Sequence, residues 1–153
     1  MHKIYKFISY CLIPFIYLNT FIRLIKKKED SNRYKERFGF TNLKKNVAKE
    51  VVWIHASSVG EFKSCDLLIN HFYKKYNLLI TTTTKTASDF AIKNYGEKII
   101  HQYAPYDVIP WIDKFLETWK PKLVIWIESD IWPNTIVRLR EKKISAIFLN
   151  ARI

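Results

Sequence analysis

From Val51 onward, short apolar runs alternate with longer stretches of helical spacing, and this alternation constrains the fold more than any other feature of the sequence. The apolar runs predict five strands, at Val51–His55, Leu78–Thr81, Ile99–Tyr103, Leu123–Ile127 and Ala146–Leu149. The stretches between them predict four helices, at Phe62–Tyr76, Thr86–Tyr95, Val108–Trp119 and Pro133–Lys143. Strand–helix alternation is typical of a parallel sheet covered on both faces. The predicted fold class is therefore α/β, with a Rossmann-like parallel sheet.

The first part of the chain differs from the rest and predicts a membrane-facing segment. Phe7–Ile25 is 19 residues long and contains one charged residue, Arg23, whereas a helix needs about 20 apolar residues to cross a bilayer. Three interpretations stay open: a single span, a helix lying in the membrane interface, and a helix packed on the domain. If the segment spans, Lys26–Lys28 would hold the following domain on the cytoplasmic side. The expected divisions are an anchor or interfacial helix at 1–30, a short helix and linker at 31–50, and the sheet domain at 51–153. The short helix is expected to end at Gly39, because glycine is favoured just past a helix end.

The positive charge of the chain is concentrated at the same end. The net charge is +12, and residues 1–50 carry 12 Lys or Arg against 4 Asp or Glu. Because this charge adjoins an apolar segment, it favours an anionic membrane surface as partner over nucleic acid, for which the sequence contains no binding motif. The two cysteines, Cys11 and Cys65, have no metal-binding or redox spacing, so neither a disulfide framework nor a metal site is predicted.

Polar residues follow every predicted strand. They lie at Ser57–Glu61, Thr81–Thr86, Pro105–Asp107, Glu128–Asn134 and Asn150–Arg152. Because the carboxyl ends of parallel strands meet at one edge of a sheet, we expect these residues to form the ligand site. Hydroxyls, carboxylates and a guanidinium suit a polyhydroxylated or phosphorylated ligand, and helix N-termini at the same edge favour an anion.

Each of these residues can also have a purely structural role. Ser58 and Glu61 match the capping-box pattern S-x-x-E, which satisfies free backbone N–H groups where a helix begins. Further roles of this kind are a helix cap for Thr84 and Asp107, a helix start for Pro133, core packing for Trp132 and an ion pair for Arg152. Spacing alone does not decide between a structural role and a role in ligand binding.

Taken together, the motifs resemble a known family. They are H-A-S-S-V-G-E at His55–Glu61, T-T-T-T at Thr81–Thr84, P-Y-D at Pro105–Asp107, E-S-D-I-W-P-N at Glu128–Asn134, N-A-R at Asn150–Arg152 and E-R-F-G at Glu36–Gly39. Their order over residues 34–153 is similar to that in the N-terminal half of bacterial Kdo transferases, which add 3-deoxy-D-manno-octulosonic acid (Kdo) to a lipid A precursor. The resemblance implies a GT-B glycosyltransferase with two Rossmann-like domains. It also implies CMP-Kdo as donor, no cofactor or metal, and a place at the cytoplasmic face of the inner membrane.

The resemblance implies that Glu61 is the catalytic base. The positions expected to bind the acceptor are Ser57, Ser58, Gly60, Thr83, Thr84, Glu128, Asp130, Trp132, Asn150 and Arg152. Two departures stand out: the family commonly has proline and glycine around Lys85 and Ala87, and it usually has glutamate where this chain has Asp130.

A GT-B site forms between two domains, and the donor-binding domain of the family does not occur within these 153 residues. We therefore expect this chain to be the acceptor-side half, as a fragment, a split-gene product or a decayed gene, and to need a separate C-terminal donor-binding chain for activity. A rival hypothesis is a membrane-tethered, non-catalytic binding module for an anionic glycolipid. A stand-alone nucleotide-binding domain is disfavoured, because the sequence contains no G-x-G-x-x-G motif or phosphate loop.

Overall fold

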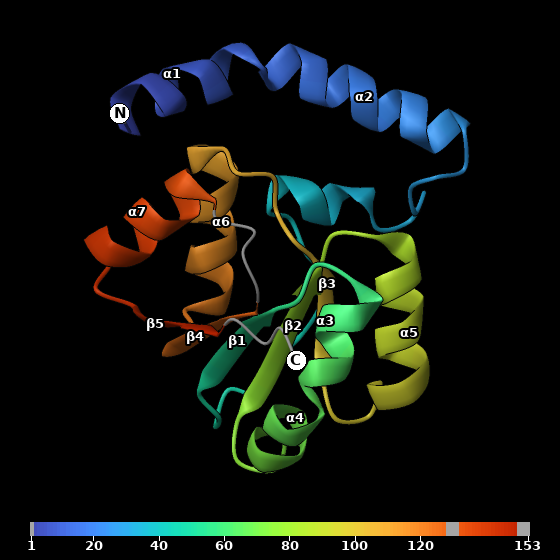
Figure 1. Ribbon diagram of the computed structural model, residues 1–153, viewed down its shortest axis with the longest axis vertical. Coiled ribbons are helices and arrows are strands. Elements are labelled where there is room, and N and C mark those ends of the chain that lie inside the picture. The colour runs from blue at the N-terminus through green and yellow to red at the C-terminus, as the bar shows by residue number, and fades with distance from the viewer. Residues whose placement is uncertain (1, 128–131, 150–153) are drawn as a thin grey trace.

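The computed structural model describes residues 2–127 and 132–149, and its centre is a five-stranded parallel sheet (Figure 1). The strands are β1 (Val51–His55), β2 (Asn77–Thr82), β3 (Ile100–Tyr103), β4 (Leu123–Ile127) and β5 (Ser145–Leu149), in the order β3-β2-β1-β4-β5. All neighbouring pairs are parallel. The predicted fold class is confirmed, and each predicted strand is correct to within one residue at either end.

Helices cover both faces of the sheet, as the alternation predicts. One face carries α3 (Val59–Ser64), α4 (Asp66–Phe72) and α5 (Lys85–Tyr95), and the other carries α6 (Ile109–Trp119) and α7 (Pro133–Glu141). Successive side chains of β1 point to opposite faces. Val52 and Ile54 therefore pack with Phe62 in one core cluster, while Val51 and Trp53 join a second cluster that includes residues of α6. Both faces of β1 are buried, which explains its continuous apolar run.

The predicted helix Phe62–Tyr76 is wrong in one respect, because it forms two helices that meet at Cys65. Glu61's backbone carbonyl accepts the Ser64 hydroxyl at 2.7 Å and contacts the Cys65 thiol at 3.4 Å. Side chains thus compete with the backbone for this carbonyl. The Cys65 amide bonds the carbonyl of Phe62, three residues back, and the helix axis changes direction there.

The apolar N-terminal segment also forms two helices, α1 (His2–Cys11) and α2 (Ile13–Ile25), which meet at an angle of 53°. Pro14 lies in the first turn of α2, and proline disfavours helical geometry in the residue before it. Within the described residues, no individual helix has both the length and the apolar character needed to cross a membrane. The bent pair meets those two criteria only when its helices are taken together.

The helix pair lies across the end of the sheet at which the strands finish (Figure 1). Its inner side is held by polar and aromatic contacts: Asn134 at the start of α7 donates to Ser9 at 3.1 Å, and Thr20 bonds the Tyr106 hydroxyl at 3.0 Å. Tyr17 stacks on Phe38 with ring centroids 4.7 Å apart. The N-terminal segment is therefore packed on the domain and lies directly over the edge where a ligand site is expected.

Between the helix pair and the sheet lies η1 (Tyr34–Phe38), a short 3-10 helix. It ends at Gly39, whose φ of 76° is a left-handed conformation that favours glycine. A Cβ at this position would lie 2.3 Å from the Trp111 carbonyl oxygen. Gly39 thus lets the turn after η1 approach the backbone of α6, and the predicted helix end at this glycine is confirmed.

Candidate functional site

The candidate site lies at the carboxyl end of β1, where the order of the strands reverses. The chain runs outward from β1 to β2 and β3, then returns to place β4 on the other side of β1. In open α/β sheets such a switch point is where ligands bind. The predicted positions Glu128 and Asp130, in the loop after β4, lie outside the described residues, as do Asn150 and Arg152 after β5.

Glu61 lies in the first turn of α3 and forms a variant of the predicted capping box. Its amide donates to the Ser58 hydroxyl at 3.3 Å, and Ser58 is the N-cap of α3. In return the Ser58 hydroxyl donates to Glu61 Oε1 at 3.1 Å. Oε2 accepts the backbone N–H of Ser57 at 2.6 Å, one residue before the N-cap whose N–H a standard capping box uses. Within 2–127 and 132–149 the carboxylate is thus held by one donor on each oxygen. A carboxylate can accept about four hydrogen bonds, so these contacts leave capacity for a ligand hydroxyl.

A buried set of neutral groups supports this turn from below. Trp53 Nε1 donates to Thr81 Oγ1 at 2.8 Å, and the same hydroxyl lies 2.9 Å from His55 Nδ1. The other ring nitrogen, His55 Nε2, lies 3.0 Å from Ser57 Oγ. We call Trp53, His55, Ser57 and Thr81 the strand cluster. It connects the body of β1 to the residue whose amide holds Glu61.

His55 lies between two hydroxyls of the strand cluster. Thr81 Oγ1 accepts the indole N–H of Trp53 and can still donate to His55 Nδ1 or accept from it, and Ser57 Oγ can do the same with Nε2, so either neutral tautomer satisfies both ring nitrogens. The ring is fully buried and lies 4.3 Å from Trp126 and 5.0 Å from Trp132, measured between ring centroids. Burial lowers the pKa of His55 to about 3, and the histidine is neutral at physiological pH.

Two threonines of the predicted set have different roles. Thr83 donates its hydroxyl to the Ser57 carbonyl at 3.0 Å, which links the loop after β2 to the Glu61 turn. Thr84 is the N-cap of α5 and accepts the Ala87 amide at 3.1 Å, so its predicted role as a helix cap is confirmed. Gly60 is exposed, and a Cβ there would meet only Ser58 Oγ at 3.8 Å. Thr83 thus contacts the Glu61 turn, whereas Thr84 caps α5.

Asp107, in the loop after β3, caps a helix, but this helix is α7 and not α6, which follows it in the chain and has Val108 as its N-cap. Asp107 Oδ2 accepts the Asn134 amide at 3.0 Å and its Oδ1 accepts the Thr135 amide at 2.8 Å, both at the start of α7. Pro133 lies in the first turn of α7, as predicted. Trp132 is partly buried against the core on one side and lines a surface pocket on the other.

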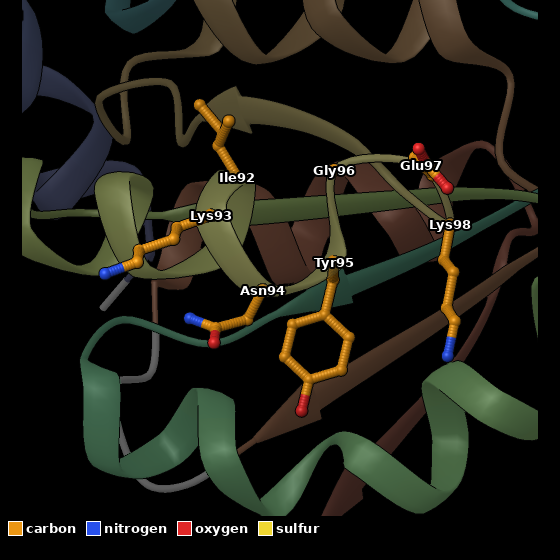
Figure 2. A pocket seen from close by; sticks show the side chains of 7 residues that line it. All are labelled: Ile92, Lys93, Asn94, Tyr95, Gly96, Glu97 and Lys98. Atoms are coloured by element: carbon orange, nitrogen blue, oxygen red, sulfur yellow. The ribbon is translucent and has the colours of Figure 1, made fainter.

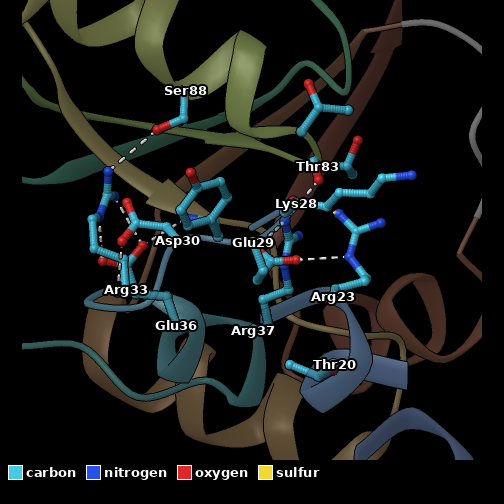
Figure 3. A network of polar contacts seen from close by, with 12 residues as sticks. Thr20, Arg23, Lys28, Glu29, Asp30, Arg33, Glu36, Arg37, Thr83 and Ser88 are labelled. Atoms are coloured by element: carbon cyan, nitrogen blue, oxygen red, sulfur yellow. Dashed lines mark hydrogen bonds and ion pairs between the residues drawn. The ribbon is translucent and has the colours of Figure 1, made fainter. Parts of the chain in front are cut away.

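A second polar cluster lies between the N-terminal helices and the same edge of the sheet, and it was not predicted (Figure 3). Glu29 accepts two bonds from Arg37 at 2.9 Å and one from Arg23 at 3.0 Å. We call Arg23, Glu29 and Arg37 the linker cluster. Arg37 also donates to the Thr83 carbonyl at 2.8 Å, so Thr83 joins the linker cluster to the Glu61 turn. Arg37 belongs to the E-R-F-G motif, the one sequence signal that could have identified it.

A hollow of about 390 Å³ lies far from these residues, where α5 ends and the chain enters β3 (Figure 2). In that view Tyr95 and Lys98 point toward α3 and α4, the helices that connect β1 to β2. They bond Asp66 at 2.9 Å and Asn70 at 3.0 Å, respectively. The hollow is at the amino end of the strands and its main polar groups pair with α4, so we do not place the site there.

The carboxyl edge, as far as the structure describes it, offers mainly hydrogen-bonding groups. Over 2–127 and 132–149, no group of three or more His, Cys, Asp or Glu side chains is arranged to hold an ion. The fold gathers there hydrogen-bond donors, aromatic rings and several held carboxylates, among them Glu29, Glu61 and Asp107. This combination suits a polar, anionic ligand that carries hydroxyl groups.

Comparison with known proteins agrees with this description. Residues 32–153 match a family model described as "3-Deoxy-D-manno-octulosonic-acid transferase (kdotransferase)". The match covers η1, the whole sheet and both clusters except for Arg23 and Glu29.

Individual relatives carry the same description. A 3-deoxy-D-manno-octulosonic acid transferase of Rickettsia bellii is 35% identical over 100% of this chain and 37% of its own length. A probable mitochondrial enzyme of that name from Arabidopsis thaliana is also 35% identical, over 100% of this chain and 35% of its own. The Haemophilus influenzae enzyme is 32% identical over 84% of this chain and 31% of its own. This chain therefore spans little more than a third of the curated relatives it matches.

Proposed function

The chain belongs to the 3-deoxy-D-manno-octulosonic acid (Kdo) transferase family, and we propose that it provides the acceptor side of Kdo transfer from CMP-Kdo to a lipid A precursor. The observation that carries the proposal is the position of Glu61. Its carboxylate lies at the switch point of the sheet and is held, among the residues that the structure describes, by one donor on each oxygen, which leaves acceptor capacity for a ligand hydroxyl.

In the proposed reaction, Glu61 is the general base. Its carboxylate takes the proton of an acceptor hydroxyl while that oxygen forms a bond to the anomeric carbon of Kdo. The bond from that carbon to the CMP phosphate oxygen breaks, CMP leaves with the electron pair, and the configuration inverts. The Ser57 amide and the Ser58 hydroxyl fix the direction of the carboxylate, which is the preorganisation that general-base catalysis needs. No metal or cofactor takes part in this proposal.

The donor is proposed to bind mainly to a second domain of the GT-B type. A GT-B enzyme closes its site from two sides, and the sheet domain of this chain supplies one of them. Because this chain spans about 37% of the R. bellii relative, the rest of the activity belongs to sequence outside these 153 residues, in the same or a separate chain.

We also propose that α1 and α2 rest on the cytoplasmic face of the inner membrane. Their outer side exposes a row of large apolar side chains: Ile4, Phe7, Ile8, Leu12, Phe15, Leu18, Phe21 and Ile25. Phe7 and Phe15 are 69% and 67% exposed. Lys26–Lys28 are exposed at the end of α2, where they would contact anionic headgroups. This placement brings the carboxyl edge of the sheet next to a lipid-borne acceptor.

The test is a transfer assay with CMP-Kdo and a lipid A precursor, using this chain combined with a donor-binding half. Glu61→Gln is the decisive variant, because glutamine preserves a capping box while it cannot accept the proton. We expect a loss of roughly 10²- to 10⁴-fold in rate, the usual contribution of a general base. Glu97→Gln, at the opposite end of the strands, is the matched control and should retain full activity. Undiminished transfer by Glu61→Gln would refute the assignment.

The second candidate function, a binding module for an anionic glycolipid, is favoured by the donors gathered at the linker cluster. It predicts acceptor binding without transfer under every combination of chains. Binding of the lipid A precursor by this chain alone, with no Kdo incorporated when the donor-binding half is added, would establish it in place of the enzyme.

A further inference from the structure

A small pocket opens between α2 and the loops that follow β2 and β3. Its volume is about 230 Å³, and it is lined by Asn19 and Arg23 of α2, by Glu29 and Arg37, and by the rings of Tyr106 and Trp132. This volume is several times the ~30 Å³ that a water molecule occupies in the liquid. The pocket can therefore hold a group of several atoms.

Arg37 is the most buried cation of the pocket and has donors without an acceptor. Its side chain is 5% exposed, and its guanidinium carbon lies 4.6 Å from the centre of the Tyr103 ring. Nε donates to Glu29, and Nη2 donates to Glu29 and to the Thr83 carbonyl. Nη1 donates to no residue within 2–127 and 132–149. Among the described residues only the Tyr103 hydroxyl is a fully buried side-chain polar atom without a partner, so Nη1 is open to solvent and can donate to a ligand that enters the pocket.

Arg33 provides the contrast within the same network. Like Arg37 it lies against Tyr103, at 5.0 Å from the ring centre. All three of its nitrogens are used: Nε and Nη2 by Glu36, Nη1 by Ser88, and Nη2 also by His101. Arg33 thus has a structural role that is complete within the chain, whereas Arg37 does not.

Arg23 repeats the pattern of Arg37 on the other side of Glu29. Nε donates to Glu29 at 3.0 Å and Nη2 donates to the Lys28 carbonyl at 3.2 Å, while Nη1 has no acceptor in the described part of the chain. Its side chain is 36% exposed. Two cations therefore share one carboxylate, and the linker cluster carries a net charge of +1 with two guanidinium groups facing one pocket. Glu29 orients both groups and leaves one charge to be neutralised.

We propose that this pocket is an anion subsite that binds a phosphate monoester. Guanidinium groups present planar pairs of donors that match phosphate oxygens, and a charged ligand strengthens such bonds. Asn19 supplies a further amide donor, and the two aromatic rings give apolar walls to whatever the phosphate is attached to. The phosphate can come from free phosphate or from a lipid headgroup, which share this chemistry.

The subsite deepens the proposed function and rests on it for the identity of the lipid. Its preference for an anion follows from the two arginines and does not depend on that function. Thr83 receives Arg37 at its carbonyl and donates its hydroxyl to Ser57, whose amide holds Glu61. A phosphate in the pocket would thus be positioned against the same turn as the proposed base. The subsite would fix the anionic part of an acceptor while its hydroxyl reaches Glu61.

The test measures anion binding without any donor present. Calorimetric titration with inorganic phosphate gives the free-phosphate arm. Flotation with phosphatidylcholine vesicles containing phosphatidic acid, against vesicles with equal charge from phosphatidylserine, gives the lipid arm. The whole chain is used in four forms: unchanged, Arg23→Gln, Arg37→Lys and Lys44→Gln. Lys44 is exposed and lies outside the pocket, so its variant matches the change in charge.

We expect Arg23→Gln to weaken phosphate binding roughly tenfold, the effect of one charge-assisted bond, and Lys44→Gln to change it less than about twofold. Arg37→Lys keeps the charge beside Glu29 but removes the planar donors, so it should weaken binding as well. If the lipid is the source, the preference for phosphatidic acid over phosphatidylserine disappears in Arg23→Gln. Equal losses in Arg23→Gln and Lys44→Gln in both arms would overturn the inference.

The same titration on Glu61→Gln separates the subsite from the proposed function. Phosphate binding should be unchanged in that variant. Retained transfer by Glu61→Gln with phosphate binding lost in Arg23→Gln would refute the base while it supports the subsite. Lost transfer by Glu61→Gln with phosphate binding unaffected in Arg23→Gln would support the base and refute the subsite.

Discussion

The strand cluster and the linker cluster lie at the same edge of the sheet, yet they differ in charge and in how far their polar groups are hydrogen-bonded within the chain. The strand cluster, defined by Trp53, His55, Ser57 and Thr81, is neutral, and each ring nitrogen has a partner inside the chain. Its groups come from β1, from the start of its loop and from β2, so the sheet itself holds them. This cluster serves to fix the end of β1 and the turn that carries Glu61.

The linker cluster is charged and incomplete. Arg23 and Arg37 share Glu29, whose side chain is 1% exposed, and each arginine keeps one nitrogen without an acceptor among the residues described. Its groups come from α2 and from the segment after it, outside the sheet. The contrast is between a cluster whose ring nitrogens are all paired within the chain and one that keeps guanidinium donors open to a ligand.

The greatest loss of stability should follow removal of the shared carboxylate of the linker cluster. Glu29→Ala leaves the buried Arg37 cation without its partner, and we expect the free energy of unfolding to fall by about 3–5 kcal/mol. Urea denaturation followed by circular dichroism measures this. Glu50→Ala, which breaks the exposed pair with Lys122, is the control and should change stability little. Similar losses in the two variants would show that the linker cluster is not buried in solution.

The strand cluster should be nearly as sensitive, but for a different reason. His55→Ala removes a fully buried ring packed on Trp126 and leaves the hydroxyls of Thr81 and Ser57 without a ring partner. Cavity and unsatisfied groups together should cost about 3 kcal/mol. Equilibrium unfolding in urea measures the loss, and His71→Ala, at an exposed position, is the control. A loss no greater than that of the control would contradict the role of the ring.

The pH dependence of stability reports on two buried histidines, His55 of the strand cluster and His101, which lies near Arg33 and Arg37. Burial lowers the pKa of His55 to about 3, and burial together with Arg33 and Arg37 lowers the pKa of His101 to about 3. In the unfolded chain histidine has a pKa of about 6.5, so below that pH the unfolded state binds protons that the folded state does not. The free energy of unfolding should be independent of these groups above pH 6.5 and fall as the pH decreases below it.

The expected slope between about pH 6.5 and 4.5, before carboxylates protonate, is about 1.4 kcal/mol per pH unit for each histidine. Urea denaturation at closely spaced pH values measures it. His101→Gln should remove about half of the slope and leave the part due to His55. A stability that does not change over this interval would show that the folded protein admits the imidazolium form.

The mildest change concerns the residue that joins the two clusters. Thr83→Val removes the hydroxyl bond to the Ser57 carbonyl and keeps the backbone carbonyl that accepts Arg37. We expect a loss of about 1 kcal/mol, the usual net contribution of one such bond. Thermal unfolding measures it against Thr118→Val, whose hydroxyl bonds only within α6. A loss equal to that of Thr118→Val would mean that Thr83 does not couple the clusters.

Much of the fold follows from the order of the residues. The strands at Val51–His55 and Leu123–Ile127 were predicted to the residue, because strands buried on both faces must be apolar without interruption. The capping box of Ser58 and Glu61, the cap at Thr84 and the helix end at Gly39 were also predicted. These features depend on neighbours within a few positions, which a sequence displays directly.

The errors have the opposite cause. The breaks at Leu12 and Cys65 were missed because apolar periodicity continues through both, while a proline and two side chains bonded to the Glu61 carbonyl change the backbone. The linker cluster was missed because its charges are separated by six and eight positions along the chain. A sequence cannot show that the two arginines meet at Glu29 or that Arg37 reaches the carbonyl of Thr83.

Local patterns and the polar residues at the end of each strand were thus enough to predict the α/β fold class and the edge at which we propose the site, whereas the candidate base Glu61 came from the resemblance to the Kdo transferase family. The folded structure was needed to show that α2 packs over that edge and that Arg23 and Arg37 meet at Glu29. Ion pairing and burial act between groups that are close in space, whatever their separation along the chain, and no local pattern records that proximity.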